Sequence, residues 1–156
     1  MISIKSIADE RLDFAFDCVQ IVIKSTESHL SAEEQTYTPA ARKGLNKGKP
    51  TEVAKNYHQY IKSFGMLMLN SGLVAALLFA QGKAKKGDEK GKAYGLIISH
   101  LTTRLKNREL ITQVDKQAIE ELFNKDGSDI RIITREALSF LEDLKRVADA
   151  RLYNPE

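Results

Sequence analysis

The sequence predicts an all-α fold, a single compact bundle of about six helices that spans residues 1–156. Apolar residues recur at spacings of three and four along most of the chain, which is the period of one helix face. No segment has a convincing strand pattern. The length of 156 residues, with 42% hydrophobic and 29% charged residues, fits one folded domain.

The first helix is expected directly after Ser6, because Ser6 and Asp9 have the spacing of a capping box. One apolar face follows, made of Ala8, Leu12, Ala15, Val19 and Val22. Residues 26–50 lose this period and collect Ser, Thr, Gly and Pro. They predict a long basic loop, a flexible arm between the first and second helices.

A helix restarts near Thr51 and enters the apolar run Phe64–Ala80. This run is shorter than the roughly 20 apolar residues of a membrane span. It is also interrupted by Asn70, Ser71 and Gly72, which are typical of helix ends, with a new N-cap expected at Asn70 or Ser71. We therefore expect two short buried helices that meet at a tight corner. Residues 82–92, "GKAKKGDEKGK", predict a second basic loop.

Three more helices are expected in the last third of the chain. The first has an apolar face of Tyr94, Ile97, Leu101 and Leu105. Thr112 and Asp115 again have capping-box spacing and open a shorter helix that ends at Phe123. The last helix begins near Ser128 or Asp129, and its face contains Ile130, Ile133, Ala137, Phe140, Leu144 and Val147.

Charge is distributed unevenly along the chain. The formal net charge is only +3, but residues 42–108 carry 14 Lys or Arg and three acids, whereas the rest of the chain is net negative. A basic middle on an acidic scaffold indicates a polyanionic partner. The single Cys18 excludes an internal disulfide and fits a reducing cytosol, and acids near the N-terminus argue against a secretion signal. We expect a cytoplasmic protein with no membrane partner.

The sequence contains no recognisable catalytic or metal-binding motif, so we expect no enzyme activity, no cofactor and no metal. The three histidines, His29, His58 and His100, share no ligand spacing. Asp9, Asp13 and Asp17 lie away from the apolar face of their helix and point to water. Cys18 lies beside that face and is interpreted as a packing residue.

Recognition of nucleic acid is the remaining interpretation. Lys55 and Lys62 are two helical turns apart and share a face, with Tyr57 and Tyr60 nearby. Lysines supply phosphate contacts and tyrosines can stack on bases. Both tyrosines also suit the core, and Tyr60 suits it better. The preceding loop adds Arg42, Lys43, Lys47 and Lys49, a basic arm suited to an RNA backbone.

Two segments resemble the α-helical small subunit of Cmr complexes, the type III-B CRISPR effectors: "NSGLVAALLFAQGK" (70–83) and "ITREALSFLEDLKRVADARL" (133–152). The first fits a G-L-x-x-A-L-x-F helix followed by lysines, and the second fits a T-R-E-A-L…L-K-R…A signature. The resemblance covers about residues 51–152. In two places the chain departs from the family: Asp143 stands where the family often has a tryptophan, and residues 26–50 are longer than in compact members.

The resemblance implies a stacked subunit beside a repeated backbone subunit and a large subunit, lining a groove for guide RNA paired with target RNA, in antiviral defence. Cleavage would belong to other subunits. The expected RNA-contacting residues are Lys43, Lys47, Lys49, Lys55, Lys62, Lys83, Lys86, Lys145 and Arg146. Local pairing with Glu142 is an alternative role for Lys145 and Arg146. Two other functions stay open: a free-standing helical nucleic-acid-binding protein, and an assembly subunit that touches only protein. The small subunit of type III-A complexes is the most easily confused family.

Overall fold

The computed structural model of the chain describes residues 6–27 and 52–151, with the backbone alone for 24–27. Within them lie six helices: α1 (Ile7–Glu27), α3 (Glu52–Ser71), α4 (Leu73–Ala84), α5 (Glu89–Asn107), α6 (Asp115–Phe123) and α7 (Gly127–Arg151). These residues contain no strand, so the predicted all-α class is confirmed. The long loop expected over residues 26–50 lies almost wholly outside the described residues.

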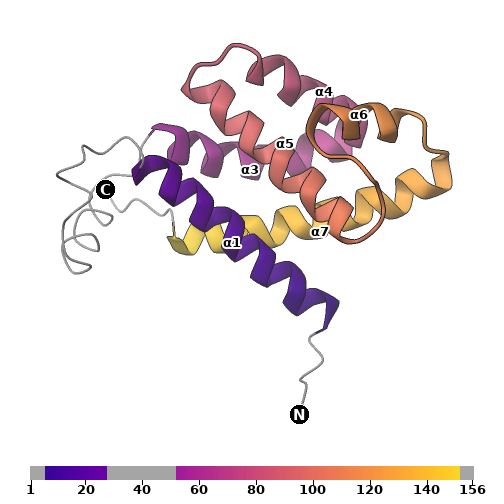
Figure 1. The fold of residues 1–156 in the computed structure, drawn as a ribbon, viewed down its shortest axis with the longest axis horizontal. Coiled ribbons are helices and arrows are strands. Elements are labelled where there is room, and N and C mark those ends of the chain that lie inside the picture. Colours follow the sequence, from indigo (N-terminus) through magenta and orange to yellow (C-terminus); the bar gives the residue numbers. More distant parts are fainter. Residues whose placement is uncertain (1–5, 28–51, 152–156) are drawn as a thin grey trace.

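Helix α5 runs through the middle of the structure and packs on α3, α4 and α7 (Figure 1). Helix α1 crosses α7, and its N-terminal end projects past the other helices. All six described helices contribute to one hydrophobic cluster. Phe14 of α1 and Phe140 of α7 stack in it with ring centroids 5.4 Å apart. Within residues 6–27 and 52–151 no helix has the length and apolar character needed to cross a bilayer.

The start of α1 confirms the predicted capping box. Asp9 N donates to Ser6 Oγ over 3.1 Å, and Ser6 N donates to the Asp9 carboxylate over 3.3 Å. The apolar face is confirmed only in its later part: Ala15, Val19 and Val22 are buried, whereas Ala8 is exposed and Leu12 is 42% exposed. The difference arises because the first turns of α1 project beyond the helices that could cover them (Figure 1).

The corner expected within the apolar run Phe64–Ala80 is confirmed at Gly72, which separates α3 from α4 with φ +90° and ψ 163°. Gly72 itself, rather than Asn70 or Ser71, is the N-cap of α4. One side of this helix pair is buried, through Met68, Leu73, Ala76, Leu77 and Ala80. Full burial of the run was a wrong expectation, since α3 and α4 lie at the surface and the outer side chains remain exposed: Met66, Leu69, Leu78 and Phe79.

Replacing Gly72 by alanine is expected to destabilise the fold by about 1–3 kcal/mol, because only glycine adopts this backbone region without strain. Nothing lies within 4 Å of the added Cβ, so the cost is conformational and not a clash. Gly65→Ala is the matched control, since Gly65 lies inside α3 and nothing lies within 4 Å of its added Cβ either. Alanine there should increase the free energy of unfolding by as much as about 1 kcal/mol. Urea unfolding of both variants measures the difference. Equal effects would contradict the strain argument.

The basic segment 82–92 differs from the expected loop, because most of it is helical. Helix α4 continues to Ala84 and α5 already begins at Glu89. Asp88 makes this short connection possible: its side chain accepts a hydrogen bond from Gly91 N over 2.7 Å and caps α5. Gly87 supplies the positive φ of +68° that ends the preceding turn.

The capping box expected from Thr112 and Asp115 is wrong, although α6 does run from Asp115 to Phe123. The carboxylate of Glu121 accepts hydrogen bonds from the backbone N of Thr112 and Gln113, each over 2.9 Å. Asp115 N instead donates to Thr102 Oγ1 of α5 over 3.0 Å. The backbone N–H groups of Thr112 and Asp115 are therefore bound by Glu121 and Thr102, which are distant in sequence, and not by each other's side chains. Helix α7 begins at Gly127, within two residues of the predicted start.

Candidate nucleic-acid interface

The two lysines that the sequence placed on one face of α3 are both exposed. Lys55 Nζ lies 3.8 Å from Glu52, and Lys62 Nζ lies 3.5 Å from Asp149 of α7. The side chains of Lys55 and Lys62 are 46% and 50% exposed. Ion pairs with this exposure contribute only about 0–1 kcal/mol, so a phosphate can compete for either ammonium group.

Asp149 connects α3 to the C-terminal part of α7. His58 Nε2 lies 2.6 Å from Asp149 Oδ1, and this hydrogen bond, together with the charge of Lys62, holds the pKa of Asp149 below its usual range. Lys145 lies one helical turn before Asp149 and is exposed, which places it on the same side of α7. The Lys62–Asp149 contact joins the two helices, and helical spacing puts Lys55 on the side of α3 that carries Lys62. We call the three exposed lysines, Lys55, Lys62 and Lys145, the α3–α7 basic face.

Lys83 and Lys86 lie at the far end of α4. Lys83 Nζ is 5.4 Å from the ring centroid of Phe79, and Lys86 is exposed in the turn before α5. The Phe79 ring meets Tyr94 of α5 in a T-shaped contact at 5.8 Å, and Tyr94 stacks on Tyr60 of α3 at 4.2 Å. A continuous row of rings therefore leads from these lysines back to α3.

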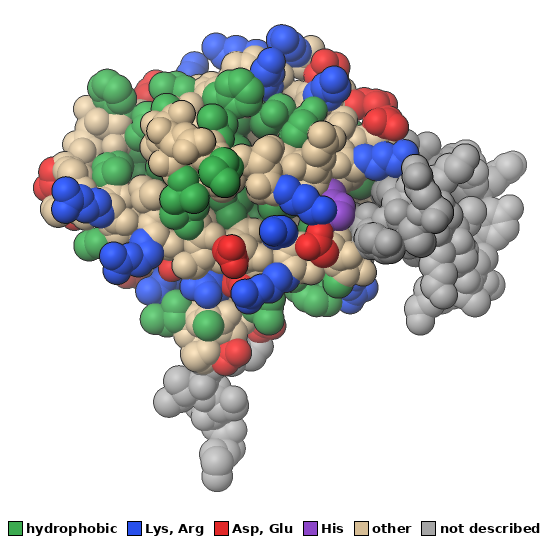
Figure 2. All heavy atoms as spheres, turned by 180° about the vertical axis from the view of Figure 1, so that it is seen from behind, with side chains coloured by type: hydrophobic (Ala, Val, Ile, Leu, Met, Phe, Trp, Pro, Cys, Tyr) green, Lys and Arg blue, Asp and Glu red, His purple; other side chains and the backbone are tan. Residues whose placement is uncertain are grey.

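Figure 2 shows the molecule from behind the view of Figure 1. Lys and Arg side chains lie along the upper edge, in the right half and toward the lower left of this face, with hydrophobic side chains between the upper group and the others and acidic side chains at the upper right. The positive charge is therefore divided by an apolar strip and does not form one unbroken patch.

The two tyrosines of α3 have the opposite roles to those expected. Tyr57 is fully buried, and its hydroxyl lies 2.7 Å from Nδ1 of the buried His100. Tyr60, expected to suit the core better, is only partly buried and stacks on Tyr94 at the edge of the core. Tyr57 lies close both to His100 of α5 and to Cys18 of α1, whereas Tyr60 stacks on the partly buried Tyr94, so the packing of other helices on α3 decides which ring is covered.

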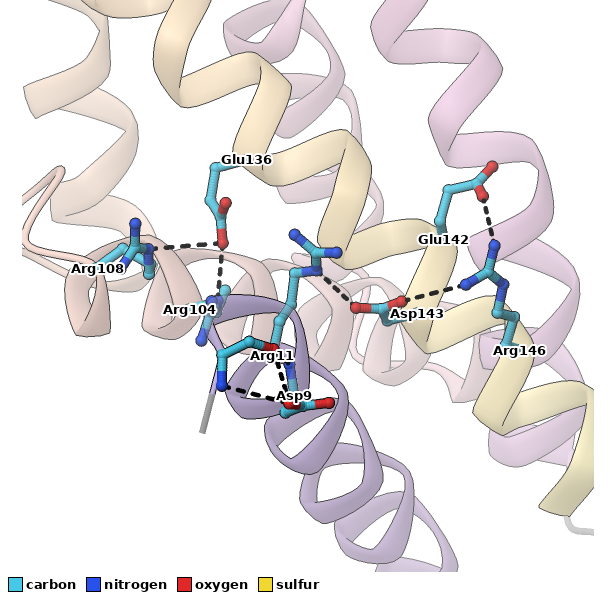
Figure 3. A network of polar contacts seen from close by, with 9 residues as sticks. Asp9, Arg11, Arg104, Arg108, Glu136, Glu142, Asp143 and Arg146 are labelled. Atoms are coloured by element: carbon cyan, nitrogen blue, oxygen red, sulfur yellow. Dashed lines mark hydrogen bonds and ion pairs between the residues drawn. The ribbon is translucent and has the colours of Figure 1, made fainter. Parts of the chain in front are cut away.

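Arg146 is separate from the α3–α7 basic face. It lies 3.6 Å from Glu142 and 3.8 Å from Asp143 of its own helix, which confirms the local pairing for this residue. Figure 3 shows Asp143 between Arg146 and Arg11 of α1, whose Nε donates to Asp143 Oδ2. Among the described residues Lys145 has no such acidic partner.

Asp143, the departure from the family pattern, is a buried contact between helices. Its side chain is 7% exposed and its carboxylate lies 2.6 Å from Arg11 of α1. An ion pair thus joins α1 to α7 at the position where an aromatic side chain often stands in the family.

Glu136 belongs to the T-R-E-A-L segment and has a structural role that its sequence position did not indicate. Its Oε1 atom accepts from Nε of the buried Arg104 over 2.9 Å and lies 3.9 Å from Nε of Arg108 (Figure 3). Arg104 Nη2 has no hydrogen-bond partner in the part of the chain that the structure describes. A polar residue in the middle of the apolar α5 pattern was the only sequence signal for this buried pair.

Three expected RNA contacts, Lys43, Lys47 and Lys49, lie outside the described residues. The sequence did not indicate that two aromatic side chains, Phe79 and Tyr94, reach the surface. Phe79 and Tyr94 were assigned to the apolar pattern, although Phe79 is 46% exposed and Tyr94 is only partly buried. A lysine one helical turn from each ring, Lys83 and Lys90, was the signal that could have identified them.

The cysteine, aspartate and histidine side chains that could serve catalysis or metal binding lie in surroundings that do not favour either role. Burial, together with the charge of Asp17, raises the pKa of the Cys18 thiol to about 12, so Cys18 is a packing residue as expected. Asp9, Asp13 and Asp17 are exposed on α1, which also confirms their predicted direction. Burial lowers the pKa of His100 to about 4, which keeps its imidazole neutral at pH 7. Within the described residues no three His, Cys, Asp or Glu side chains are grouped as metal ligands would be.

Comparison with known families is consistent with this arrangement. The family described as CRISPR-associated protein (Cas_Cmr5) matches residues 33–151, which include α3 to α7 and both characteristic segments up to Arg151. No curated protein sequence matches the chain. Because the family match extends over more than half of the sequence, the chain belongs to the Cas_Cmr5 family, the small subunits of the type III-B CRISPR complexes called Cmr.

Proposed function

We propose that this chain is a non-catalytic, cytoplasmic subunit that stacks with further copies of itself and lines the groove for guide RNA paired with target RNA in antiviral defence. Its other partners are the repeated backbone subunit and the large subunit of the Cmr complex. The observation that supports the RNA contact is the exposure of Lys55 and Lys62 on α3 and of Lys145 on α7, one helical turn from the Asp149 that Lys62 contacts.

Phosphate contact suits this face better than base reading does. Its cationic groups are ammonium groups on flexible stems, which bind phosphates as point charges and carry no sequence information. Sequence would then be read by pairing between the two RNA strands, as in other RNA-guided effectors. The weak, exposed pairs of Lys55 and Lys62 leave both groups able to exchange a carboxylate for a phosphate.

Stacking of copies is supported by unlike surfaces on one molecule. Helix α1 exposes Glu10 and the apolar Leu12 in its first two turns and Asp17 at its middle. The described lysines and arginines of the basic middle lie on α3, α4 and α5 and in the turns that follow α4 and α5. Contact between unlike surfaces is heterologous and continues from copy to copy, which produces a short filament.

Charge reversal tests the RNA contact. The triple variant Lys55→Glu, Lys62→Glu, Lys145→Glu should still assemble with its partner subunits but bind target RNA more weakly. If all three lysines contact phosphates of the duplex, the log–log salt slope should fall by about 2.7, at 0.9 per contact. The matched control is Lys106→Glu, Lys116→Glu, Arg131→Glu, which changes the net charge equally at three exposed positions on α5, α6 and the start of α7.

The outcomes separate the competing functions. Equal loss of binding in both triple variants would contradict a specific face and indicate a general charge effect. Failure of the first variant to assemble would favour an assembly subunit that touches only protein. Comparable affinity of the isolated chain for DNA and RNA, with no gain from partner subunits, would indicate a free-standing nucleic-acid-binding protein.

A further inference from the structure

Three aromatic rings from three helices meet at the surface beside the α4–α5 turn. Tyr60 and Tyr94 stack almost in parallel, with an interplanar angle of 11°, and Phe79 meets Tyr94 at 86°. Phe79 is 46% exposed, and neither tyrosine is fully buried. These rings take no part in the phosphate contacts proposed for the α3–α7 basic face. We call Tyr60, Phe79 and Tyr94, with Lys83 and Lys90, the ring–lysine surface.

Lysines accompany the rings at helical spacing. Lys83 lies one turn after Phe79 and its Nζ is over that ring, while Lys90 lies one turn before Tyr94 and is exposed. The turn between the helices adds two more exposed cations, Lys85 and Lys86. Two acids, Asp88 and Glu89, stand among the five lysines of residues 82–92, which leaves this segment with a net charge of +3. The charge of this corner is therefore positive and suits a polyanion.

Exposed rings beside cations favour unpaired nucleic acid over a duplex. In a duplex the bases are paired and stacked on one another, so their faces cannot reach a protein ring. In a single strand each base can stack on an aromatic side chain while lysines hold the phosphates. Stacking is tolerant of sequence, because every base has a π-face.

We propose that the ring–lysine surface binds an unpaired segment of RNA, with bases stacked on Phe79 and the tyrosine rings and with Lys83 and Lys90 on the phosphates. The inference rests on the proposed function in taking RNA as the polyanion, but it assigns a second surface and a different state of the strand. All five residues come from one chain, so the isolated protein should bind the single strand without partner subunits.

The experiment compares Phe79→Leu with the unmodified chain. Leucine keeps an apolar side chain on α4 but removes the ring, and Phe79→Tyr restores a ring. Phe123→Leu is the matched control, because Phe123 is 74% exposed at the end of α6. Each protein is titrated with a labelled single-stranded RNA of about twelve nucleotides, and with an RNA duplex of the same length, at several salt concentrations from about 50 mM.

Phe79→Leu should weaken single-strand binding about 5- to 150-fold, the range that follows from loss of one stacked base. Its salt slope and its duplex affinity should stay unchanged, since no phosphate contact is lost. Phe79→Tyr should restore most of the affinity, and Phe123→Leu should have no effect. The double variant Lys83→Gln, Lys90→Gln should lower the single-strand salt slope by about 1.4, at 0.7 per contact.

Three results would overturn the inference: no measurable binding of the unmodified chain to the single strand at low salt, equal effects of Phe79→Leu and Phe123→Leu, or loss of complex assembly by Phe79→Leu with RNA binding intact. The last would make this surface a protein contact. The proposed function fails separately, when charge reversal on the α3–α7 basic face leaves duplex binding unchanged. Unchanged melting temperatures of the Phe79 variants exclude unfolding as the cause.

Discussion

Replacing Glu136 by leucine is expected to destabilise the protein by about 3–5 kcal/mol, because it leaves the Arg104 guanidinium charged and buried without a counterion. Arg104 is 4% exposed and Glu136 is 14% exposed, so little water could replace the carboxylate. Arg108 lies 3.9 Å from the same oxygen and adds like-charge repulsion once that oxygen is gone. The midpoint and slope of urea unfolding measure the loss.

Two further variants separate a lost counterion from a lost side chain. The double variant Arg104→Leu, Glu136→Leu should lie within roughly 1.5 kcal/mol of the unmodified protein, because an apolar pair avoids the cost of desolvating two charges. Glu142→Leu is the matched control on α7, since Glu142 is 68% exposed and, within residues 6–27 and 52–151, pairs only with the exposed Arg146. It should change stability by less than about 0.5 kcal/mol. A double variant as unstable as Glu136→Leu would contradict the counterion argument.

Acidification from pH 6.5 to pH 4 is expected to remove roughly 3 kcal/mol of stability through His100 alone. Burial lowers the pKa of His100 from 6.5 to about 4. Between these values the unfolded chain binds a proton at this imidazole and the folded chain does not. The unfolded state is therefore favoured as the pH falls across this window, and below pH 4, where both states are protonated, this dependence ends.

Chemical denaturation at several pH values tests this expectation. His100→Gln keeps a polar partner for the Tyr57 hydroxyl but does not titrate. Between pH 4 and pH 6.5 the slope of its unfolding free energy against pH should therefore be smaller than in the unmodified protein, by up to the amount that corresponds to one bound proton. Tyr57→Phe is the control, because it removes the hydroxyl and leaves the buried imidazole. It should be less stable at every pH and retain the steep dependence. An unchanged slope in His100→Gln would show that groups other than His100 cause the pH dependence of stability.

Features fixed by neighbours within one helical turn were predictable from the sequence. The Ser6–Asp9 capping box formed as its spacing predicts, and the apolar period located α3, α5 and α7. Thr112 and Asp115 have the same spacing as that first pair, but Glu121 and Thr102 took their backbone groups. A local rule therefore held only where no distant side chain competed for the same donors.

The candidate site was predictable in part. The sequence placed Lys55 and Lys62 on one face of a helix, and both are exposed there. It could not show that Lys145 comes to the same surface, because this depends on the packing of α3 against α7. Nor could it distinguish Tyr57 from Tyr60, or show that Phe79 stays exposed, since both depend on how the other helices pack on α3 and α4.

The sequence by itself determined the helical class, the corner at Gly72, the basic middle and the family, because these follow from short-range spacing, composition and motif. Only the tertiary structure decided which side chains are covered: the buried Arg104–Glu136 pair, the neutral His100, and the open rings of Tyr60, Phe79 and Tyr94. The physical reason is that helical periodicity gives the direction of a side chain around its own axis. Burial and charge pairing depend on what another helix places against that direction.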